Sequence, residues 1–277
     1  MITNKRVLVT GGAGSVGSEL VRQLAAQKNF IFILDIDETR AFDLRTELRE
    51  KGLWVASRNG DIRNQDTLFD VFSDFKPEIV IHAAALKHVT PCEEYPEEAV
   101  ATNINGTLNL IREAQRWECL EKFIFVSTDK VVNAKCIMGI TKLAAESIVR
   151  NRGNRFVAVR FGNVAHSRGS VLQIWKRQYE AGEPLTITDP EMTRYMMSIP
   201  EACELVLEAG ELGNNGQLWI LDMGKPKRII DLKNEIYGED YPIKIIGTRP
   251  GETLDEKLMT LDEEKIAIKQ GKFYVIN

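Results

Sequence analysis

The feature that most constrains the fold is a glycine-spaced loop near the start of the chain. Gly11, Gly14 and Gly17 follow the apolar segment Arg6–Val9, and the helical pattern Ser15–Gln27 begins within the loop. The first glycine permits a tight turn, the second lets a pyrophosphate approach the backbone, and the third lets the helix pack closely on the strand. Free N–H groups at the helix N-terminus then face the phosphates. This context predicts a dinucleotide-binding strand–loop–helix unit.

The first half of the chain repeats this alternation of strand and helix. Its apolar runs are continuous, which is typical of parallel strands with helices on both faces. The alternation predicts an α/β fold with a doubly wound parallel sheet of the Rossmann type. The predicted strands are Arg6–Val9, Phe30–Leu34, Trp54–Ser57, Ile79–His82, Phe123–Ser127 and Phe156–Arg160. The predicted helices are Ser15–Gln27, Glu38–Lys51, Asp66–Phe72, Glu97–Trp117 and Met138–Asn151.

The pattern loosens after residue 161, where six prolines separate shorter elements. Ile199–Ala209 has a helical pattern, and Leu218–Leu221 has that of a strand. We expect residues 1–161 to form an NAD(P)-binding Rossmann domain and residues 162–277 a smaller C-terminal α/β substrate lobe. Such a lobe would cover the carboxyl ends of the strands, where doubly wound sheets bind their ligands.

Composition narrows the partners and the compartment. The formal net charge of -4 argues against nucleic acid, whose phosphate backbone selects basic surfaces. The four cysteines contain no C-x-x-C pair, so we expect reduced thiols, a cytoplasmic protein and no metal site. The segment Met1–Lys5 lacks the apolar run of a signal peptide, and no apolar stretch is long enough to predict a membrane span.

Further residues extend the predicted cofactor site. Asp35 ends the second strand, where a carboxylate accepts hydrogen bonds from the adenosine ribose, and its charge favours NAD over NADP. Arg40 is near enough in sequence to soften that preference, so NADP stays open. Asp61 and Ile62 follow the third strand, where adenine contacts are common. The predicted cofactor residues so far are Gly11, Gly14, Ser15, Val16, Gly17, Asp35, Arg40, Asp61, Ile62, Ala83, Ala84 and Lys87.

Three later motifs are more specific than the glycine loop. They are Ser127-Thr-Asp-Lys130, Arg160-Phe-Gly-Asn-Val164 and Gly247-Thr-Arg-Pro-Gly-Glu252. With them the chain resembles the extended short-chain dehydrogenase/reductase superfamily over nearly its whole length. Within that superfamily it resembles the nucleotide-sugar 4,6-dehydratases of bacterial polysaccharide biosynthesis, which act on UDP-N-acetylglucosamine. The longer relatives carry membrane-spanning segments ahead of the catalytic domain, and we expect none in this chain.

The resemblance implies a lyase reaction without net redox. Hydride leaves C4 of the sugar for the nicotinamide, water is lost across C5–C6, and the hydride returns to C6, with or without inversion at C5. Asp129 would be the acid at the C6 hydroxyl and Lys130 the base at C5, and Lys130 would need a lowered pKa for that role. Thr128 would bind the C4 hydroxyl, and Lys142 would bind the nicotinamide ribose as a further cofactor residue.

One position departs from the superfamily pattern. Met138 stands where most members have Tyr, four residues before Lys142. A subset of the 4,6-dehydratases also has Met here, and a thioether cannot exchange a proton with the C4 oxygen. The resemblance leaves three groups for the C4 proton, which are Thr128 through water, Lys142 and Asp129.

The resemblance also implies a substrate end. The Asn163 amide would contact the diphosphate, and three arginines would converge on the UDP group, because a guanidinium donates in pairs to phosphate. Glu252 would accept from the uridine ribose, and Thr186 would lie against the uracil. The expected substrate residues are Lys87, His88, Asn163, Arg168, Thr186, Arg194, Arg249 and Glu252.

Other functions stay open from the sequence. A nucleotide-sugar 4-epimerase or 4-reductase usually needs the Tyr that Met138 replaces and has no need of the Asp129–Lys130 pair. A non-catalytic dinucleotide-binding regulator would need no acid–base pair. Relatives pair the helices that correspond to Glu97–Trp117 and Met138–Asn151 between subunits, so we expect a homo-oligomer, a dimer or larger.

Overall fold

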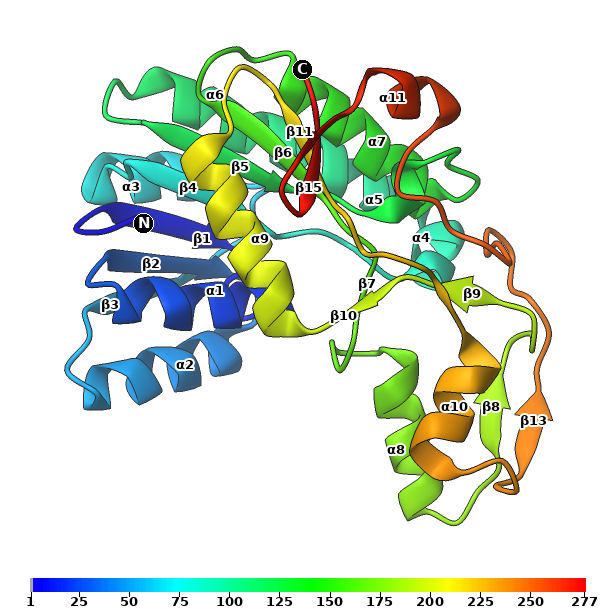
Figure 1. The fold of residues 1–277 in the computed structure, drawn as a ribbon. Helices are drawn as coiled ribbons and strands as arrows, with labels where there is room; N and C mark the ends of the chain where they lie inside the picture. Colours follow the sequence, from blue (N-terminus) through cyan, green and yellow to red (C-terminus); the bar gives the residue numbers. More distant parts are fainter. Residues whose placement is uncertain (1) are drawn as a thin grey trace.

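The computed structural model describes residues 2–277, which fold around one large sheet with a small lobe beside it (Figure 1). The strands of the large sheet are β1 (Arg6–Thr10), β2 (Phe30–Asp35), β3 (Val55–Asn59), β4 (Ile79–His82), β5 (Lys122–Val126), β6 (Phe156–Arg160), β11 (Leu218–Leu221), β14 (Ile268–Gln270) and β15 (Phe273–Ile276). Their order is β14-β15-β11-β6-β5-β4-β1-β2-β3. Strands β1–β6 and β11 run parallel, whereas β15 and β14 are antiparallel to their neighbours. The order 3-2-1-4-5-6 is that of the Rossmann fold, so the predicted fold class is confirmed.

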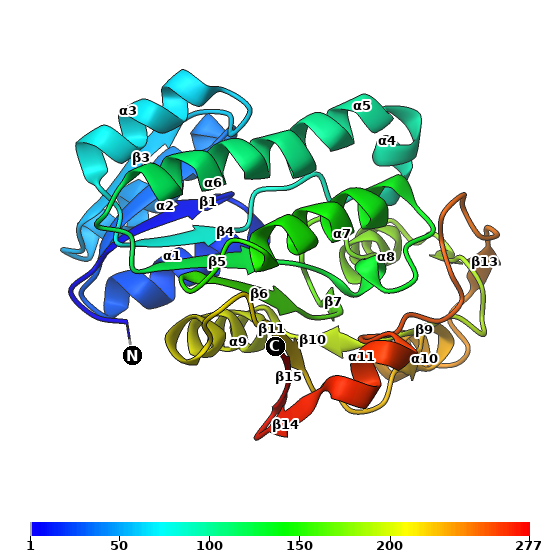
Figure 2. The same ribbon diagram turned by 90° about the horizontal axis from the view of Figure 1, so that it is seen from above.

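Helices cover both faces of this sheet (Figure 2). One face carries α1 (Ser15–Ala26), α2 (Glu38–Glu50) and α9 (Ile199–Leu212), and the other carries α3 (Gln65–Phe75), α6 (Thr107–Arg116) and α7 (Ile137–Arg150). In α1, Leu20, Val21 and Leu24 recur at helical spacing and are fully buried. This spacing aligns one apolar stripe with the sheet, which is why the segment forms a helix that packs there.

The chain returns to the large sheet after residue 161. Strand β11 pairs with β6 because Leu218–Ile220 is apolar and buried on both faces, and β15 and α9 join the same core, whereas the residues of β14 are exposed at the edge of the sheet. Segments from beyond residue 161 therefore contribute to the core of the large sheet. Met1, the first residue of the predicted Rossmann range, lies outside the described residues.

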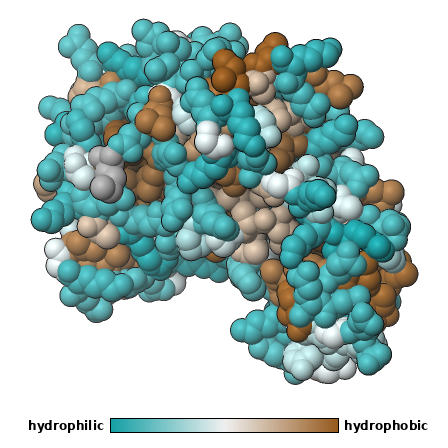
Figure 3. Space-filling model, in the orientation of Figure 1, coloured by the Kyte–Doolittle hydropathy of each residue, from teal (hydrophilic) through white to brown (hydrophobic). Residues whose placement is uncertain are grey.

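The small lobe has a core of its own. Its main elements are α8 (Val171–Glu180), β8 (Leu185–Ile187), α10 (Ile229–Tyr237) and β13 (Ile243–Ile245). Trp175 is fully buried at the centre and donates through its ring nitrogen to the Thr186 carbonyl at 2.8 Å. Apolar residues also gather on the lobe's surface (Figure 3), where Ile243 and Ile245 of β13 are exposed.

The predicted helix Glu97–Trp117 contains a π-helical stretch. It is built from α5 (Pro96–Ala99), η1 (Val100–Gly106) and α6, and η1 has the wider π-helical winding. The Asn103 amide in η1 bonds both backbone groups of Leu86, at 2.8 and 3.1 Å, and donates to Thr141 of α7 at 3.0 Å. These bonds anchor the wider turn between the loop after β4 and α7, and such turns occur often at functional sites.

Short elements complete the fold around the sheet's carboxyl edge. They are α4 (Val89–Glu94), η2 (Asp129–Val131), β7 (Asn163–Val164), β9 (Thr193–Arg194), β10 (Met196–Met197), β12 (Lys227–Arg228) and α11 (Leu261–Ile266). Strand β7 pairs with β10, β9 with β12 and β8 with β13, so these strands form three separate two-stranded sheets. None of the helices formed by residues 2–277 combines the length and apolarity that a membrane span requires.

Candidate active site

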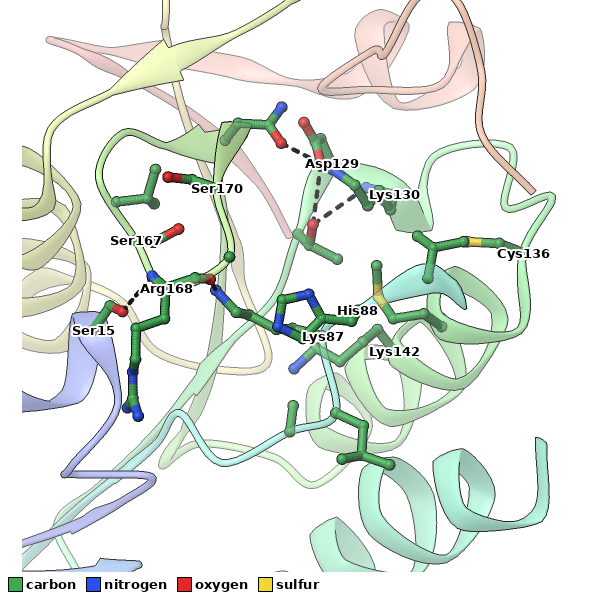
Figure 4. A pocket seen from close by; sticks show the side chains of 18 of the residues that line it. Ser15, Lys87, His88, Asp129, Lys130, Cys136, Lys142, Ser167, Arg168 and Ser170 are labelled. Carbon is green, nitrogen blue, oxygen red and sulfur yellow. Dashed lines mark hydrogen bonds and ion pairs between the residues drawn. The ribbon is translucent and has the colours of Figure 1, made fainter. Parts of the chain in front are cut away.

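One cavity of about 1820 Å³ lies at the carboxyl ends of the strands and extends to the small lobe. Figure 4 shows a close view of side chains that line it. The structure brings every residue that the sequence singled out to the wall of this cavity, although it does not group them all as expected. These residues are Gly11, Gly14, Ser15, Val16, Gly17, Asp35, Arg40, Asp61, Ile62, Ala83, Ala84, Lys87, His88, Thr128, Asp129, Lys130, Met138, Lys142, Asn163, Arg168, Thr186, Arg194, Arg249 and Glu252.

The glycine loop forms one end of the cavity and fits a dinucleotide. Gly11 has a φ of +67°, and a Cβ there would lie 2.6 Å from the Ala84 nitrogen, so only glycine is accommodated. A Cβ on Gly17 would lie 2.1 Å from the Gly11 oxygen, so the third glycine allows the close approach of helix and loop. Asp35 accepts from the Ala13 N–H at 2.8 Å and therefore braces the glycine loop.

Arg168 lies on this loop, apart from the other two predicted substrate arginines. Its backbone N–H donates to the Ser15 hydroxyl at 2.9 Å, and its guanidinium donates to the Ala13 carbonyl at 2.6 Å (Figure 4). The Lys87 ammonium donates to the Arg168 carbonyl at 2.7 Å. The polar contacts of Arg168 are therefore with the glycine loop and Lys87.

Arg194 and Arg249 have different environments. Arg194 is buried and donates to the backbone carbonyls of Thr253 and Leu254 at 2.9 and 2.8 Å. Arg249 is exposed, and its backbone N–H donates to the Glu252 carboxylate at 3.0 Å in the turn at the cavity's edge. Arg194 thus fixes the 253–254 segment, whereas the Arg249 side chain is the more accessible of the two.

Asp129 and Lys130 begin the short helix η2 directly after β5. Asp129 is fully buried, while the Lys130 side chain is 23% exposed, and the ammonium lies 3.1 Å from the Asp129 carboxylate. The Thr128 hydroxyl donates to the same carboxylate oxygen at 3.0 Å. The Asn163 amide oxygen also accepts from Lys130, at 3.3 Å. The sequence-predicted pair is thus a contact pair that faces Asn163.

The electrostatics of this pair differ from the expectation for Lys130. Burial would lower the pKa of Lys130, but the carboxylates of Asp129 and Glu256 outweigh it and raise the pKa above its ordinary value. The expected lowering, from burial or a nearby cation, is therefore wrong for the structure as it stands. Burial raises the pKa of Asp129, and the negative charge of Glu256 raises it further against the opposing charge of Lys130.

Lys142 has the lowered pKa instead. Its amine donates to the Val126 carbonyl at 2.6 Å and lies 4.0 Å above the centre of the Phe125 ring. Burial lowers the pKa of Lys142 to about 7, with Glu146 acting in the opposite direction. Met138, one helical turn earlier in α7, is buried. Close to neutral pH the cavity therefore holds a lysine amine that is substantially uncharged.

Comparison with known proteins places this site in a family. The sequence profile of the polysaccharide biosynthesis protein family matches residues 7–277. The chain belongs to this family. EpsC of Bacillus subtilis, a probable polysaccharide biosynthesis protein, is 45% identical over 276 residues, which are 95% of this chain and 46% of EpsC. The chain thus spans about half the length of that relative. UDP-glucose 4-epimerase of Rickettsia bellii is 37% identical over 294 aligned positions, covering 100% of this chain and 84% of that enzyme.

Solved structures share the fold of this polysaccharide biosynthesis family member. Pen from Bacillus thuringiensis has a TM-score of 0.90 and 34% identity, covering 99% of this chain and 88% of Pen. UDP-glucose 4-epimerase of Thermus thermophilus, solved in complex with NAD, has a TM-score of 0.76 and 25% identity, covering 93% of this chain and 91% of that one. Related structures of this fold thus bind NAD.

Sequence reasoning missed one residue of the site in this family member. Glu256 is almost fully buried, with 6% of its side chain exposed, and its carboxylate lies 2.9 Å from Lys130 and 3.3 Å from Arg194. The Asn163 amide donates to it at 2.7 Å. The only sequence signal was its place four residues after Glu252, at the end of the specific 247–252 motif. An exposed glutamate at this position would look the same in the sequence, so only the fold shows that Glu256 belongs to the site.

Proposed function

We propose that this chain is a UDP-N-acetylglucosamine 4,6-dehydratase, a lyase that forms a UDP-4-keto-6-deoxy-N-acetylhexosamine. The observation that carries the proposal is a buried carboxyl group with a raised pKa, Asp129, in the same cavity as a buried lysine whose pKa is lowered to about 7, Lys142. Dehydration needs an acid at one carbon and proton acceptors at others, and this pairing supplies both. The similarity to the polysaccharide biosynthesis family supports the choice of a nucleotide sugar.

The cofactor would be held by the glycine loop and its surroundings. Gly11 and Gly17 leave no room for a Cβ and so allow the tight loop at the start of α1, which Asp35 braces, and such a loop fits a nicotinamide dinucleotide. A bound dinucleotide supplies the hydride acceptor and donor of the reaction. We propose NAD, because the Asp35 carboxylate would repel a 2′-phosphate. Arg40 pairs with Asp37 at 2.9 Å and is free to move toward such a phosphate, so NADP is the alternative.

Lys142 is our choice for the C4 proton. Met138 cannot take it, and the Thr128 hydroxyl already donates to Asp129. An amine with a pKa of about 7 can accept the C4 hydroxyl proton without any tyrosine. Thr128 would orient the hydroxyl through the lone pair on its oxygen that does not accept from the Lys130 N–H.

Water elimination would use Asp129 and Lys130. Asp129 in its protonated form gives its proton to the C6 oxygen as the C6–O bond breaks, and a water molecule leaves. Lys130 takes the C5 proton, for which its ammonium must first lose a proton and its ion pairs must loosen when substrate enters. A proton would then return to C5 as the hydride is restored to C6, and the face from which the proton arrives would decide retention or inversion at C5.

The substrate end of the proposal follows the cavity. Asn163 would face the diphosphate, and Arg249 and Glu252 would close on the uridine from the cavity's edge. Arg194 would hold the 253–254 segment beside them, because its guanidinium already donates to the Thr253 and Leu254 carbonyls. Thr186 would lie against the uracil, with Lys87 and His88 on the side toward the sugar. Arg168 moves from the substrate end to the cofactor end, because its contacts are with Ser15 and Ala13.

We further propose that the protein acts in the cytoplasm as a homo-oligomer. Val100 of η1 and Ile140 and Leu143 of α7 are apolar and 41%, 48% and 38% exposed, and they lie on the helices that the resemblance assigns to subunit pairing. A 4-epimerase is the second candidate function, because the Rickettsia bellii relative bears that name. An epimerase would leave the mass of the sugar unchanged.

The testing experiment uses purified protein with UDP-N-acetylglucosamine and a trace of NAD, followed by mass spectrometry. A product lighter by one water, without net reduced cofactor, is the expected result. A product of unchanged mass with inverted C4 would favour the epimerase. No product with bound cofactor would favour a non-catalytic dinucleotide-binding regulator.

A further inference from the structure

Glu256 is the buried centre of the charge network on the wall of the cavity. It follows the turn at Arg249 and Glu252 and reaches from the C-terminal half of the chain to the end of β5. One carboxylate oxygen lies 2.9 Å from the Lys130 ammonium, and the other accepts from Asn163 at 2.7 Å and lies 3.3 Å from Arg194. With only 6% of its side chain exposed, Glu256 has its position fixed by these three partners.

Asp129 has one oxygen that these contacts do not explain. Its Oδ1 accepts from Thr128 and Lys130, but the buried Oδ2 has no donor within reach. A buried carboxylate oxygen without a donor is costly. The neighbouring acidic group is Glu256, because its carboxylate and that of Asp129 contact the same Lys130 ammonium, at 2.9 and 3.1 Å, and interaction with Glu256 raises the pKa of Asp129. Two facing carboxyl groups satisfy both oxygens only when one of them carries a proton.

We infer that Glu256 is a positioning residue that keeps Asp129 in its proton-donating form by accepting the Asp129 proton in a carboxyl–carboxylate contact. Lys130 and Arg194 hold Glu256 as the ionised partner, so the proton resides on Asp129. Glu256 acts through Asp129 and is not itself assigned contact with the sugar. This inference rests on the proposed dehydration, because it explains how an acid for the C6 hydroxyl persists near neutral pH.

The surrounding charges support this assignment of the proton. Lys130 faces both carboxyl groups, Arg194 faces only Glu256, and Tyr195 lies near Asp129. Lys87 is the further cation near Lys130. Burial would raise the pKa of Glu256, but the charges of Lys130 and Arg194 outweigh it and lower the pKa to about 2. The pKa values of the two carboxyl groups are thus driven apart, and Asp129 is the weaker acid.

Activity should therefore depend on pH in a definite direction. Asp129 must be protonated to give a proton to the C6 oxygen, so activity falls as pH rises through its pKa. Replacing Glu256 by Gln removes a negative charge and supplies amide N–H groups that can donate to ionised Asp129. Both changes lower the pKa of Asp129. The alkaline limb of the pH–activity profile should therefore move to lower pH. A shift of about one pH unit corresponds to about a tenfold loss of protonated Asp129 at pH values above its pKa.

The experiment compares Glu256→Gln with Glu256→Asp and with a matched control, Glu264→Gln, which removes an exposed carboxylate from α11. The expected result is an alkaline limb shifted to lower pH in Glu256→Gln, a partly restored limb in Glu256→Asp, and an unshifted profile in the control. A uniform drop in kcat at every pH, with no shift, would overturn the inference and assign Glu256 a merely structural role.

A second measurement separates this inference from the proposed function. The carboxyl carbon of Asp129, labelled with carbon-13 and identified by its absence in Asp129→Asn, is titrated by NMR in wild type and in Glu256→Gln. A lower titration midpoint in the variant supports the inference even if wild type shows no dehydratase activity. An unchanged or higher midpoint overturns it, whatever the activity is. If the midpoint shifts but no water is lost from the sugar, the proposed function fails alone.

Discussion

Two regions of one cavity shift the pKa values of two lysines in opposite directions. On the floor formed by α7 and β5, the Lys142 amine meets a backbone carbonyl and the face of Phe125. On the wall formed by η2 and the 249–258 segment, Lys130 lies between the carboxylates of Asp129 and Glu256. Burial lowers the pKa of Lys142 to about 7, whereas at Lys130 the two carboxylates outweigh burial and raise it. The facing carboxylates, more than burial, therefore decide which lysine can be a base in the resting protein.

Arg160 connects these two regions. This buried arginine of β6 pairs with Glu146 of α7 at 2.6 Å and with Glu263 of α11 at 2.9 Å. It also donates to the Leu258 carbonyl at 3.0 Å, two residues beyond Glu256. The Ser127 hydroxyl donates to Glu146 at 2.5 Å, immediately before the Thr128–Lys130 segment. The floor and the wall therefore share one buried network, and a change in one can displace the other.

The largest expected effects come from removing each lysine in turn. Lys142→Met and Lys130→Met should each lower kcat by about 10² to 10⁴, the usual contribution of a proton-transfer group. The two losses should differ in kind. Without Lys130 the C4 oxidation still occurs, so substrate should produce the absorbance of reduced nicotinamide. Without Lys142 it should not. The assay is done at saturating cofactor, with bound nucleotide measured separately.

The contrast between the two lysines is contradicted if Lys142→Met and Lys130→Met behave alike in the accumulation of reduced cofactor. If both accumulate reduced cofactor, Lys142 is not needed for the C4 proton, and Thr128 or Asp129 takes it. If neither does while nucleotide remains bound, Lys130 acts at or before C4 oxidation. Lys142→Arg is the matched control, because it keeps a cation at this position but cannot become neutral.

Breaking the connecting network should affect stability more than any single surface change. Arg160→Met leaves Glu146 and Glu263 without their buried partner, and removal of one member of a buried pair typically costs about 3–5 kcal/mol. Urea denaturation of this variant and of Arg152→Met, an exposed arginine nearby, measures the difference. A loss no greater than that of Arg152→Met would show that Arg160 does not hold the floor and wall together.

The sequence predicted the cofactor end better than the wall, for a physical reason. Gly11, Gly17 and Asp35 act through local backbone geometry and the ends of adjacent strands, so their spacing carries the information. Glu256 and Arg168 reach their partners only after β6, β11 and the small lobe have packed. Spacing also could not show the raised pKa of Lys130, because one of its two carboxylates comes from a distant segment. Asp129 beside Lys130 was predicted because the two are adjacent in sequence.

A smaller effect concerns stability against pH. The pKa of Lys142 is lower in the folded protein, about 7, than its ordinary value of 10.5. Between those values the unfolded chain binds more protons, so this residue makes stability rise with pH across that window. Lys142→Met removes that dependence. We expect its melting temperature, relative to wild type, to be highest at pH 7 or below and to decline toward pH 10. A difference independent of pH would place a charged lysine on the cavity floor.

The smallest expected effect lies at the cofactor end, beyond both lysines. The Arg168 side chain is 37% exposed. It donates to the Ala13 carbonyl in the glycine loop and pairs with Asp37 at 3.5 Å. Arg168→Ala should weaken dinucleotide binding by about 1 kcal/mol, or about fivefold, because partly exposed charged contacts contribute little each. The measurement is calorimetric titration with NAD, with Arg177→Ala of α8 as the exposed control. Weaker binding of UDP instead, with NAD binding unchanged, would return Arg168 to the substrate end and leave the glycine loop to hold the dinucleotide without it.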